Sequence, residues 1–196
     1  MLHSLLNTQV KIPDRPDAGG QSAWPGFPGT ARSELRNPLV ALPFPRENIV
    51  RDAVIVTHTH DDHWDEAAIA AIPKILPVFV QHEADAALLR SQGFQDIRLL
   101  SADSEFAGVG LQKTTSGQHG SDRTYAVPAM AERLGEACGV VFRHPQEKTL
   151  WLVGDTIWRD EIEADMLKLR PDVVVLTPAT LTLSALARSS WAKRTC

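Results

Sequence analysis

A polar cluster directly follows an apolar run in the first third of the chain, and this junction limits the folding options more than any other segment. The run Ala53–Thr57 is rich in β-branched residues and predicts a buried strand. The next six residues, His58 to His63, contain three histidines and two aspartates. Imidazole and carboxylate groups are ligands for Zn²⁺, Fe and Mn²⁺, and the spacing of His58 and His60 projects two rings to one side of an extended segment. We therefore expect a metal site here rather than a loop whose histidines merely face water.

Two later strand ends repeat the arrangement of a polar ligand after an apolar run. Leu111–Thr115 leads into His119, which is bracketed by glycines that would let the backbone approach a bound ion closely. Thr149–Val153 leads through a glycine into Asp155, a carboxylate that could bridge two metals. Taken separately, His119 could cap a turn and Asp155 could cap the following helix. Taken with the first cluster, both are candidate metal ligands.

Short β-like runs alternate with helical ones over most of the chain, which predicts a mixed α/β fold. The predicted strands are Ala53–Thr57, Val78–Gln81, Ile97–Leu100, Leu111–Thr115, Ala137–Arg143, Thr149–Val153 and Val173–Leu176. The predicted helices are Asp65–Ala71, His82–Gln92 and Asp160–Leu169. The strands on either side of residues 144–148 are typical of an antiparallel hairpin, so we exclude a simple doubly wound parallel sheet.

Composition excludes several classes of function. The chain has 196 residues, 43% of them hydrophobic, and a formal net charge of -4. One compact domain is the default for this length, and the absence of long Lys or Arg runs argues against nucleic acid or an anionic membrane surface as partner. Two cysteines are too few for a disulfide framework, and no segment is typical of a signal peptide or a membrane span. We expect a cytoplasmic protein that acts on a small molecule.

The motifs together resemble those of the metallo-β-lactamase superfamily. The resemblance covers residues 23–176 and is carried by His58-Thr59-His60-Asp61-Asp62-His63, by the Gly-bracketed His119 and by Gly154-Asp155-Thr156. Within the superfamily, Pro25-Gly26-Phe27-Pro28-Gly29-Thr30 and Arg36-Asn37-Pro38-Leu39 are similar to the metal-dependent hydrolase branch that includes ascorbate-6-phosphate lactonase-like proteins. An amidohydrolase- or histidinol-phosphatase-like barrel also uses His-x-His, but eight regular β/α repeats are not visible.

The resemblance implies an αββα sandwich and a metallo-hydrolase. It implies that one divalent ion is held by His58, His60 and His119, and that a second is held by Asp62, His63 and Asp155, with Asp155 shared. A bound ion lowers the pKa of water from about 15.7 toward about 7, and the resulting hydroxide attacks an ester, lactone, phosphodiester or similar bond. Asp62 is the candidate catalytic residue, because it would orient this nucleophile. Zinc is the expected metal, with Mn or Fe as alternatives.

Both ends of the chain depart from the superfamily pattern. The family has a further His ligand after another strand, whereas residues 177–196 contain no His. We hypothesise that this tail, and the arm formed by residues 1–22, result from shifted reading frames, which would leave the sandwich incomplete at both ends. The alternative function is then a metal-binding remnant with little or no catalysis, and uncovered sheet would favour a homo-oligomer.

Aromatic and basic residues near the motifs have two interpretations. They line the mouth of a substrate pocket, or they pack in the core or lie on the surface. The residues are Trp24, Phe27, Arg32, Arg36 and Trp64.

Overall fold

The computed structural model describes residues 34–36, 52–61 and 63–178. Contacts divide the chain into two compact units, one that includes the described residues up to Leu99 and one that includes those from Leu100 onward. The predicted arm, residues 1–22, and nearly all of the predicted tail, residues 177–196, lie outside the described residues, as do Trp24, Phe27 and Arg32.

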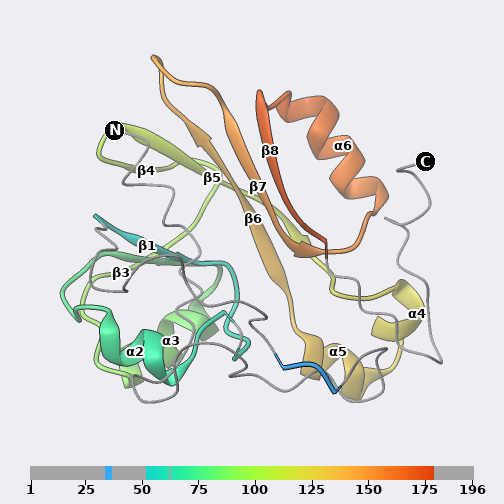
Figure 1. The fold of residues 1–196 in the computed structure, drawn as a ribbon, viewed down its shortest axis with the longest axis horizontal. Helices are drawn as coiled ribbons and strands as arrows, with labels where there is room; N and C mark the ends of the chain where they lie inside the picture. The colour runs from blue at the N-terminus through green and yellow to red at the C-terminus, as the bar shows by residue number, and fades with distance from the viewer. Residues whose placement is uncertain (1–33, 37–51, 62, 179–196) are drawn as a thin grey trace. The chain divides into compact units, whose positions relative to one another are not determined.

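The first unit is built on a three-stranded parallel sheet with strand order β1-β2-β3. Because parallel neighbours cannot be joined by a tight hairpin, each pair is connected by a segment that contains a helix. The elements, shown in green and cyan in Figure 1, are β1 (Val54–Val56), α2 (Glu66–Ala71), β2 (Val78–Val80), α3 (Glu83–Ser91) and β3 (Ile97–Leu99).

Both helices of this unit pack on one face of the sheet. Alternate residues of β1 and β2 point toward the helices, as the two-residue period of a strand requires. The buried cluster they form consists of Val54, Val56, Trp64, Ala67, Ala68, Ile72, Val78, Val80, Ala86, Leu89 and Phe94. Asp65 starts α2 by accepting a hydrogen bond from the Ala68 backbone N–H at 2.6 Å. This N-cap explains why the helix begins one residue later than predicted.

The second unit contains a five-stranded sheet with strand order β4-β5-β6-β7-β8. Neighbouring strands are antiparallel except β7 and β8, which are parallel and connected through α6. Its elements are β4 (Ser104–Phe106), β5 (Val109–Gly117), α4 (Asp122–Tyr125), α5 (Pro128–Leu134), β6 (Ala137–Arg143), β7 (Leu150–Thr156), α6 (Asp160–Leu169) and β8 (Val173–Pro178).

Helix α6 covers one face of β6 and β7, beside β8 (Figure 1). Its buried residues Ile162 and Leu169 lie seven positions apart, two turns of helix, and therefore face the sheet together. They pack against Val141, Trp151 and Val153. This packing fixes the segment between β7 and α6, which carries residues of the site described below.

Most predicted elements are present with shifted ends. The antiparallel pairing of β6 with β7 confirms the predicted hairpin. Three short elements were not predicted: β4, α4 and α5. In the described ranges, no helix combines the length and the apolar character needed to cross a membrane.

Candidate metal centre

Three histidines gather after the carboxyl end of β1. The ring centroids of His58 and His60 lie 4.7 Å apart, and those of His58 and His63 lie 4.1 Å apart. His58 is only 2% exposed, and its Nδ1 atom lies 3.2 Å from the hydroxyl of Thr57. Ligands commonly collect at the carboxyl ends of parallel strands, because these ends share one edge of the sheet. The predicted clustering of these three imidazoles is therefore present within the first unit.

A tight turn brings His63 back toward His58. The backbone N–H groups of His63 and Trp64 both donate to the carbonyl of His60, each at 2.8 Å. Trp64 then anchors the turn in the core, since its ring lies 5.3 Å from that of Phe94 and its Nε1 donates to Gln92 at 2.8 Å. Of the two interpretations of Trp64, packing in the core is the one that the structure supports.

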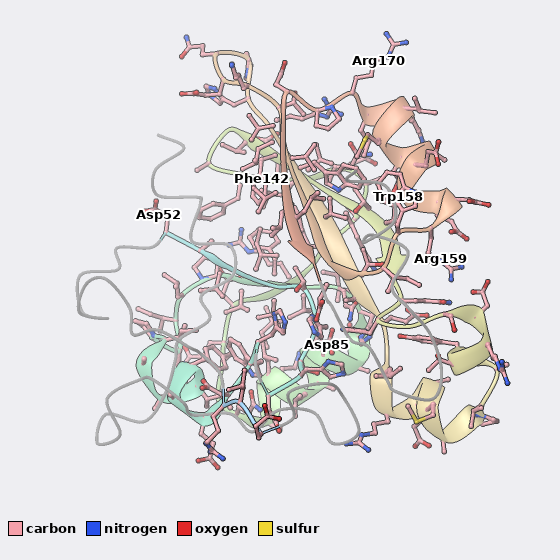
Figure 2. All side chains as sticks on the ribbon, turned by 45° about the vertical axis from the view of Figure 1, so that its right-hand side comes forward. Asp52, Asp85, Phe142, Trp158, Arg159 and Arg170 are labelled. Carbon is pink, nitrogen blue, oxygen red and sulfur yellow. The ribbon has the colours of Figure 1, made fainter. Side chains whose placement is uncertain are left out.

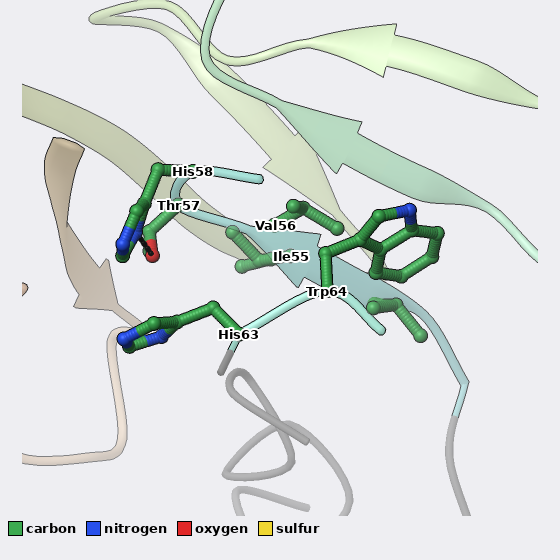
Figure 3. A pocket seen from close by; sticks show the side chains of 7 residues that line it. Ile55, Val56, Thr57, His58, His63 and Trp64 are labelled. Atoms are coloured by element: carbon green, nitrogen blue, oxygen red, sulfur yellow. Dashed lines mark hydrogen bonds between the residues drawn. The ribbon is translucent and has the colours of Figure 1, made fainter. Parts of the chain in front are cut away.

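The His58 and His63 rings line a small pocket together with residues of β1. In Figure 3 both rings lie on the same side of the backbone, while the indole of Trp64 extends to the other side. The full lining is Val54, Ile55, Val56, Thr57, His58, His63 and Trp64. Asp62, the predicted catalytic residue and metal ligand, lies outside the described residues.

A buried carboxylate on α3 supports the same loop. Asp85, which is labelled in Figure 2, is 5% exposed. It accepts a long hydrogen bond of 3.5 Å from the hydroxyl of Thr59, the residue between His58 and His60. It also lies 3.3 Å from Nδ1 of His82, which caps α3 by accepting from the Asp85 backbone N–H. Asp85 could not be identified from the sequence, because its helical position carries no motif.

His119 and Asp155 meet in the second unit, at the ends of β5 and β7, the two strands on either side of β6. The Nε2 atom of His119 lies 3.5 Å from a carboxylate oxygen of Asp155, and His119 is 4% exposed. Asp155 belongs to β7, and α6 begins only after Arg159, so Asp155 is not a helix cap. The alternative interpretation of this aspartate is therefore wrong.

Glycine determines how Asp155 is presented. Gly154 has a φ of +87°, and a Cβ atom there would lie 2.5 Å from the carbonyl oxygen of Cys138. The pairing of β7 with β8 shifts register between Leu152 and Asp155. Only glycine adopts this conformation without strain beside a neighbouring backbone. The irregularity interrupts the regular alternation of β7 just before Asp155.

The strand end that carries His119 lies close against the end of β7. A Cβ atom on Gly117 would lie 2.8 Å from Cβ of Thr156, so close packing against protein atoms accounts for this glycine. Beyond it, the Gln118 N–H donates to Thr156 Oγ1 at 3.2 Å, and the Ile157 N–H donates to the Gln118 carbonyl at 3.0 Å. Both backbone groups of Gln118 are thus paired with the segment that follows Asp155.

Tyr125 adds a further support for His119. Its hydroxyl accepts from the His119 backbone N–H at 3.2 Å and donates to the Gly135 carbonyl at 2.7 Å. Burial raises the pKa of the Tyr125 phenol above its ordinary value, so the phenol is protonated and can donate at neutral pH. Tyr125 could not be identified from the sequence, because α4 is too short to show a helical period.

The chemistry of both residue sets suits a divalent metal. The first unit contains three clustered imidazoles, and the second contains an imidazole beside a carboxylate; these are the nitrogen and oxygen donors of Zn²⁺, Mn²⁺ and Fe sites. Neutral imidazoles and an ionised carboxylate are the forms in which these groups bind a cation.

Solved structures of metal-dependent hydrolases resemble this chain. One is the isothiocyanate hydrolase from Delia radicum gut bacteria, with 46% identity and a TM-score of 0.80. Another is a possible metal-dependent hydrolase from Veillonella parvula DSM 2008, with 42% identity and the same TM-score of 0.80. Each match covers 86% of this chain and 65% of the other chain. No family model matches the sequence.

These matches, the two sheets with their helices and the His/Asp motifs define the class: a mixed α/β protein of the metallo-β-lactamase type, as the resemblance predicted. More particularly, the chain is a homologue of the UPF0173 protein YddR of Bacillus subtilis (strain 168). The two are 43% identical over 152 residues, which is 76% of this chain and 58% of YddR. The chain thus spans less than two thirds of the length of these relatives.

Proposed function

We propose that this protein is a metal-dependent hydrolase. The convergence of the His58, His60 and His63 rings at the end of β1 is the observation that supports it best. The ring of His58 lies 4.7 Å from that of His60 and 4.1 Å from that of His63, and ordering these side chains costs conformational entropy. Ligation of an ion would offset that cost.

We assign the ligands as the resemblance implies. His58, His60 and His119 would hold one divalent ion, and Asp62, His63 and Asp155 would hold a second. Asp155 would contribute to both. When bound, such an ion lowers the pKa of water from about 15.7 toward about 7 and so makes hydroxide available at neutral pH. Asp62 would hold and orient the nucleophile, because its carboxylate accepts a hydrogen bond from it.

The proposed substrate is a small molecule with an electrophilic carbon or phosphorus atom. The relative named isothiocyanate hydrolase, 46% identical to this chain, makes an isothiocyanate the first candidate. Hydrolysis of an isothiocyanate and of a lactone both begin with addition of a water oxygen to an electrophilic carbon, so one arrangement of ligands serves either reaction. A lactone and a phosphodiester are the other candidates.

Zinc is the metal we propose, because imidazole and carboxylate donors suit it and it activates water without redox chemistry. A cytoplasmic location is also part of the proposal. It rests on the cysteine content of the sequence, since two cysteines are too few for a disulfide framework.

Elemental analysis of the protein, purified without added metal or chelator, tests the proposal when combined with three assays. The assays follow consumption of benzyl isothiocyanate, of a simple lactone and of bis(p-nitrophenyl) phosphate. His58→Ala is the test variant. His144→Asn is the matched control, because His144 lies in the turn between β6 and β7 and its ring accepts from the Gln146 N–H.

We expect one or two metals per chain and turnover of at least one substrate. His58→Ala should lose both, and His144→Asn should keep both. Bound metal without turnover of any of the three substrates would instead favour the alternative function, a metal-binding remnant with little or no catalysis. Absence of metal from a folded parent protein would reject the proposal.

A further inference from the structure

Arg159 links the two sides of the His119 segment, residues 118–122. Its Nη1 donates to the side-chain oxygen of Gln118 at 2.6 Å and also to a carboxylate oxygen of Asp122. Gln118 directly precedes His119, and Asp122 follows it by three residues, so one guanidinium group holds both flanks of a predicted ligand. Figure 2 shows Arg159 directly before α6, in the segment that follows β7.

A third partner fixes the orientation of the guanidinium group. Nε and Nη2 of Arg159 donate to the two carboxylate oxygens of Glu161, each at 3.2 Å. The hydrogen bonds that Arg159 donates to Asp122 and Glu161 raise its pKa above the ordinary value, so the side chain stays charged. The planar fork of arginine offers five donors in fixed directions and so reaches the four acceptor atoms of these three residues, whereas the three donors of lysine lie on a single nitrogen.

Asp155 lies four residues before Arg159, near the end of β7. Residues 155–159 therefore contact the segment around His119 at three places. These are Asp155 itself, the Thr156 hydroxyl with the Ile157 backbone N–H, both of which bind the Gln118 backbone, and Arg159. The last contact lies at the far end of the segment and reaches past His119 to Asp122. It restricts the movement of the two ligand-bearing segments relative to one another.

We propose that Arg159 is a positioning residue, which holds the imidazole of His119 and the carboxylate of Asp155 at the separation needed for ligating a shared ion. The inference rests on the proposed function for the identity of the ligands. It goes beyond the superfamily motifs, since Arg159, Gln118 and Asp122 are not among the residues that the resemblance implies.

An ordinary surface ion pair is the competing explanation. Asp122 and Glu161 have side chains that are 82% and 50% exposed, and such pairs are worth little on their own. Arg159 differs because its own side chain is 19% exposed and because it contacts the neutral amide of Gln118. A surface pair affects overall stability slightly, whereas a positioning residue affects metal affinity while the metal-free fold stays intact.

The test compares Arg159→Lys with a matched arginine elsewhere. Lysine keeps the charge and loses the fork. Arg98→Lys is the control, because Arg98 forms the same two-pronged contact with Asp96, at 2.8 and 2.7 Å, in the first unit. The full chain is loaded with Co²⁺, its visible absorption is recorded, and its affinity for Zn²⁺ is measured by competition with a chelator. Urea unfolding of the metal-free proteins is measured in parallel.

We expect Arg159→Lys to weaken Zn²⁺ binding about 10- to 100-fold and to alter the Co²⁺ spectrum, because supporting residues around metal ligands typically act on this scale. Arg98→Lys should bind Zn²⁺ within twofold of the parent. The unfolding midpoints of the metal-free variants should differ little from one another. Equal Zn²⁺ affinity for Arg159→Lys and the parent would overturn the inference.

A second measurement separates this inference from the proposed function. Amide hydrogen exchange of the metal-free full chain reports the mobility of residues 117–125 directly. Arg159→Lys should accelerate exchange in this segment, and Arg98→Lys should not. If the parent binds no metal, the proposed function fails, and faster exchange still supports the positioning role. Unchanged exchange in Arg159→Lys would overturn the positioning role whatever the metal content.

Discussion

The Nε2 atom of His119 lies 3.5 Å from a carboxylate oxygen of Asp155, although His119 follows β5 and Asp155 lies near the end of β7. Asp155 thus brings negative charge directly beside a candidate imidazole ligand, which is the arrangement that favours a bound cation. We predict that Asp155→Asn weakens Zn²⁺ binding by about tenfold or more, because an amide oxygen carries no charge. Competition with a chelator measures the Zn²⁺ affinity of the variant and of the parent.

Asp103→Asn is the control for this prediction. Asp103 is an exposed carboxylate on the same unit, in the turn before β4, so the two variants lose the same charge. A general electrostatic effect would weaken binding equally in both variants. Such equality would contradict the assignment of Asp155 as a ligand.

Gly154 should tolerate no side chain. An alanine there must adopt a φ of +87° and place its Cβ 2.5 Å from the Cys138 carbonyl oxygen. Gly93→Ala is the matched control, because Gly93 has a φ of +91° and open space around a Cβ. We expect Gly93→Ala to cost about 1–2 kcal/mol of unfolding free energy from strain alone, and Gly154→Ala about 1–3 kcal/mol more from the clash. Urea unfolding measures both; equal costs would show that β6 and β7 separate freely.

Trp64 should matter for stability through its packing. Trp64→Ala is expected to lower the free energy of unfolding by about 3–5 kcal/mol, because the buried ring and its contact with Phe94 are lost. Trp64→Phe keeps an aromatic ring but loses the hydrogen bond to Gln92. We expect this loss to lower the free energy of unfolding by about 1 kcal/mol beyond the effect of the changed packing. Chemical unfolding of both variants checks this. A small cost for Trp64→Ala would mean that the indole is not a core anchor.

The ligand-bearing segments could be predicted because each follows an apolar, β-branched run. Strands β1, β5 and β7 end close to where this pattern ends, and the polar residues beyond them stand out against it. Strand β4 was missed since its three residues, Ser104–Phe106, are mostly polar and too few to show alternation. Helix α4 was missed because four residues do not establish a helical period, and α5 because its N-cap, Val127, has no capping side chain to mark its start.

The supports around the ligands could not be predicted for a different reason. Arg159 reaches Gln118 and Asp122 across 41 and 37 positions of sequence, and Tyr125 reaches the His119 backbone through a short helix. Such contacts depend on which strands are neighbours in the sheet, and no local spacing encodes that. Strand order β5-β6-β7 brings these segments together, and only the structure shows it.

The Asp96–Arg98 pair should make a small contribution to stability that disappears in acid. The hydrogen bond from Arg98 lowers the pKa of the Asp96 carboxyl in the folded protein. Stability from this group is therefore present above its unfolded-state pKa of about 3.9 and is lost as the pH falls through the lower folded-state pKa. Because the Asp96 and Arg98 side chains are 36% and 43% exposed, solvent screens the pair and we expect about 0.2–1 kcal/mol at pH 7.

A double-mutant cycle with Asp96→Asn and Arg98→Gln measures this coupling and cancels the other contacts of each residue. Urea unfolding at pH 7, 5 and 3.5 should show a coupling energy that stays constant between the first two values and declines toward the third. A coupling that instead grows as the pH falls would mean that Asp96 is favoured in its protonated form, opposite to the effect of the Arg98 hydrogen bond on its pKa.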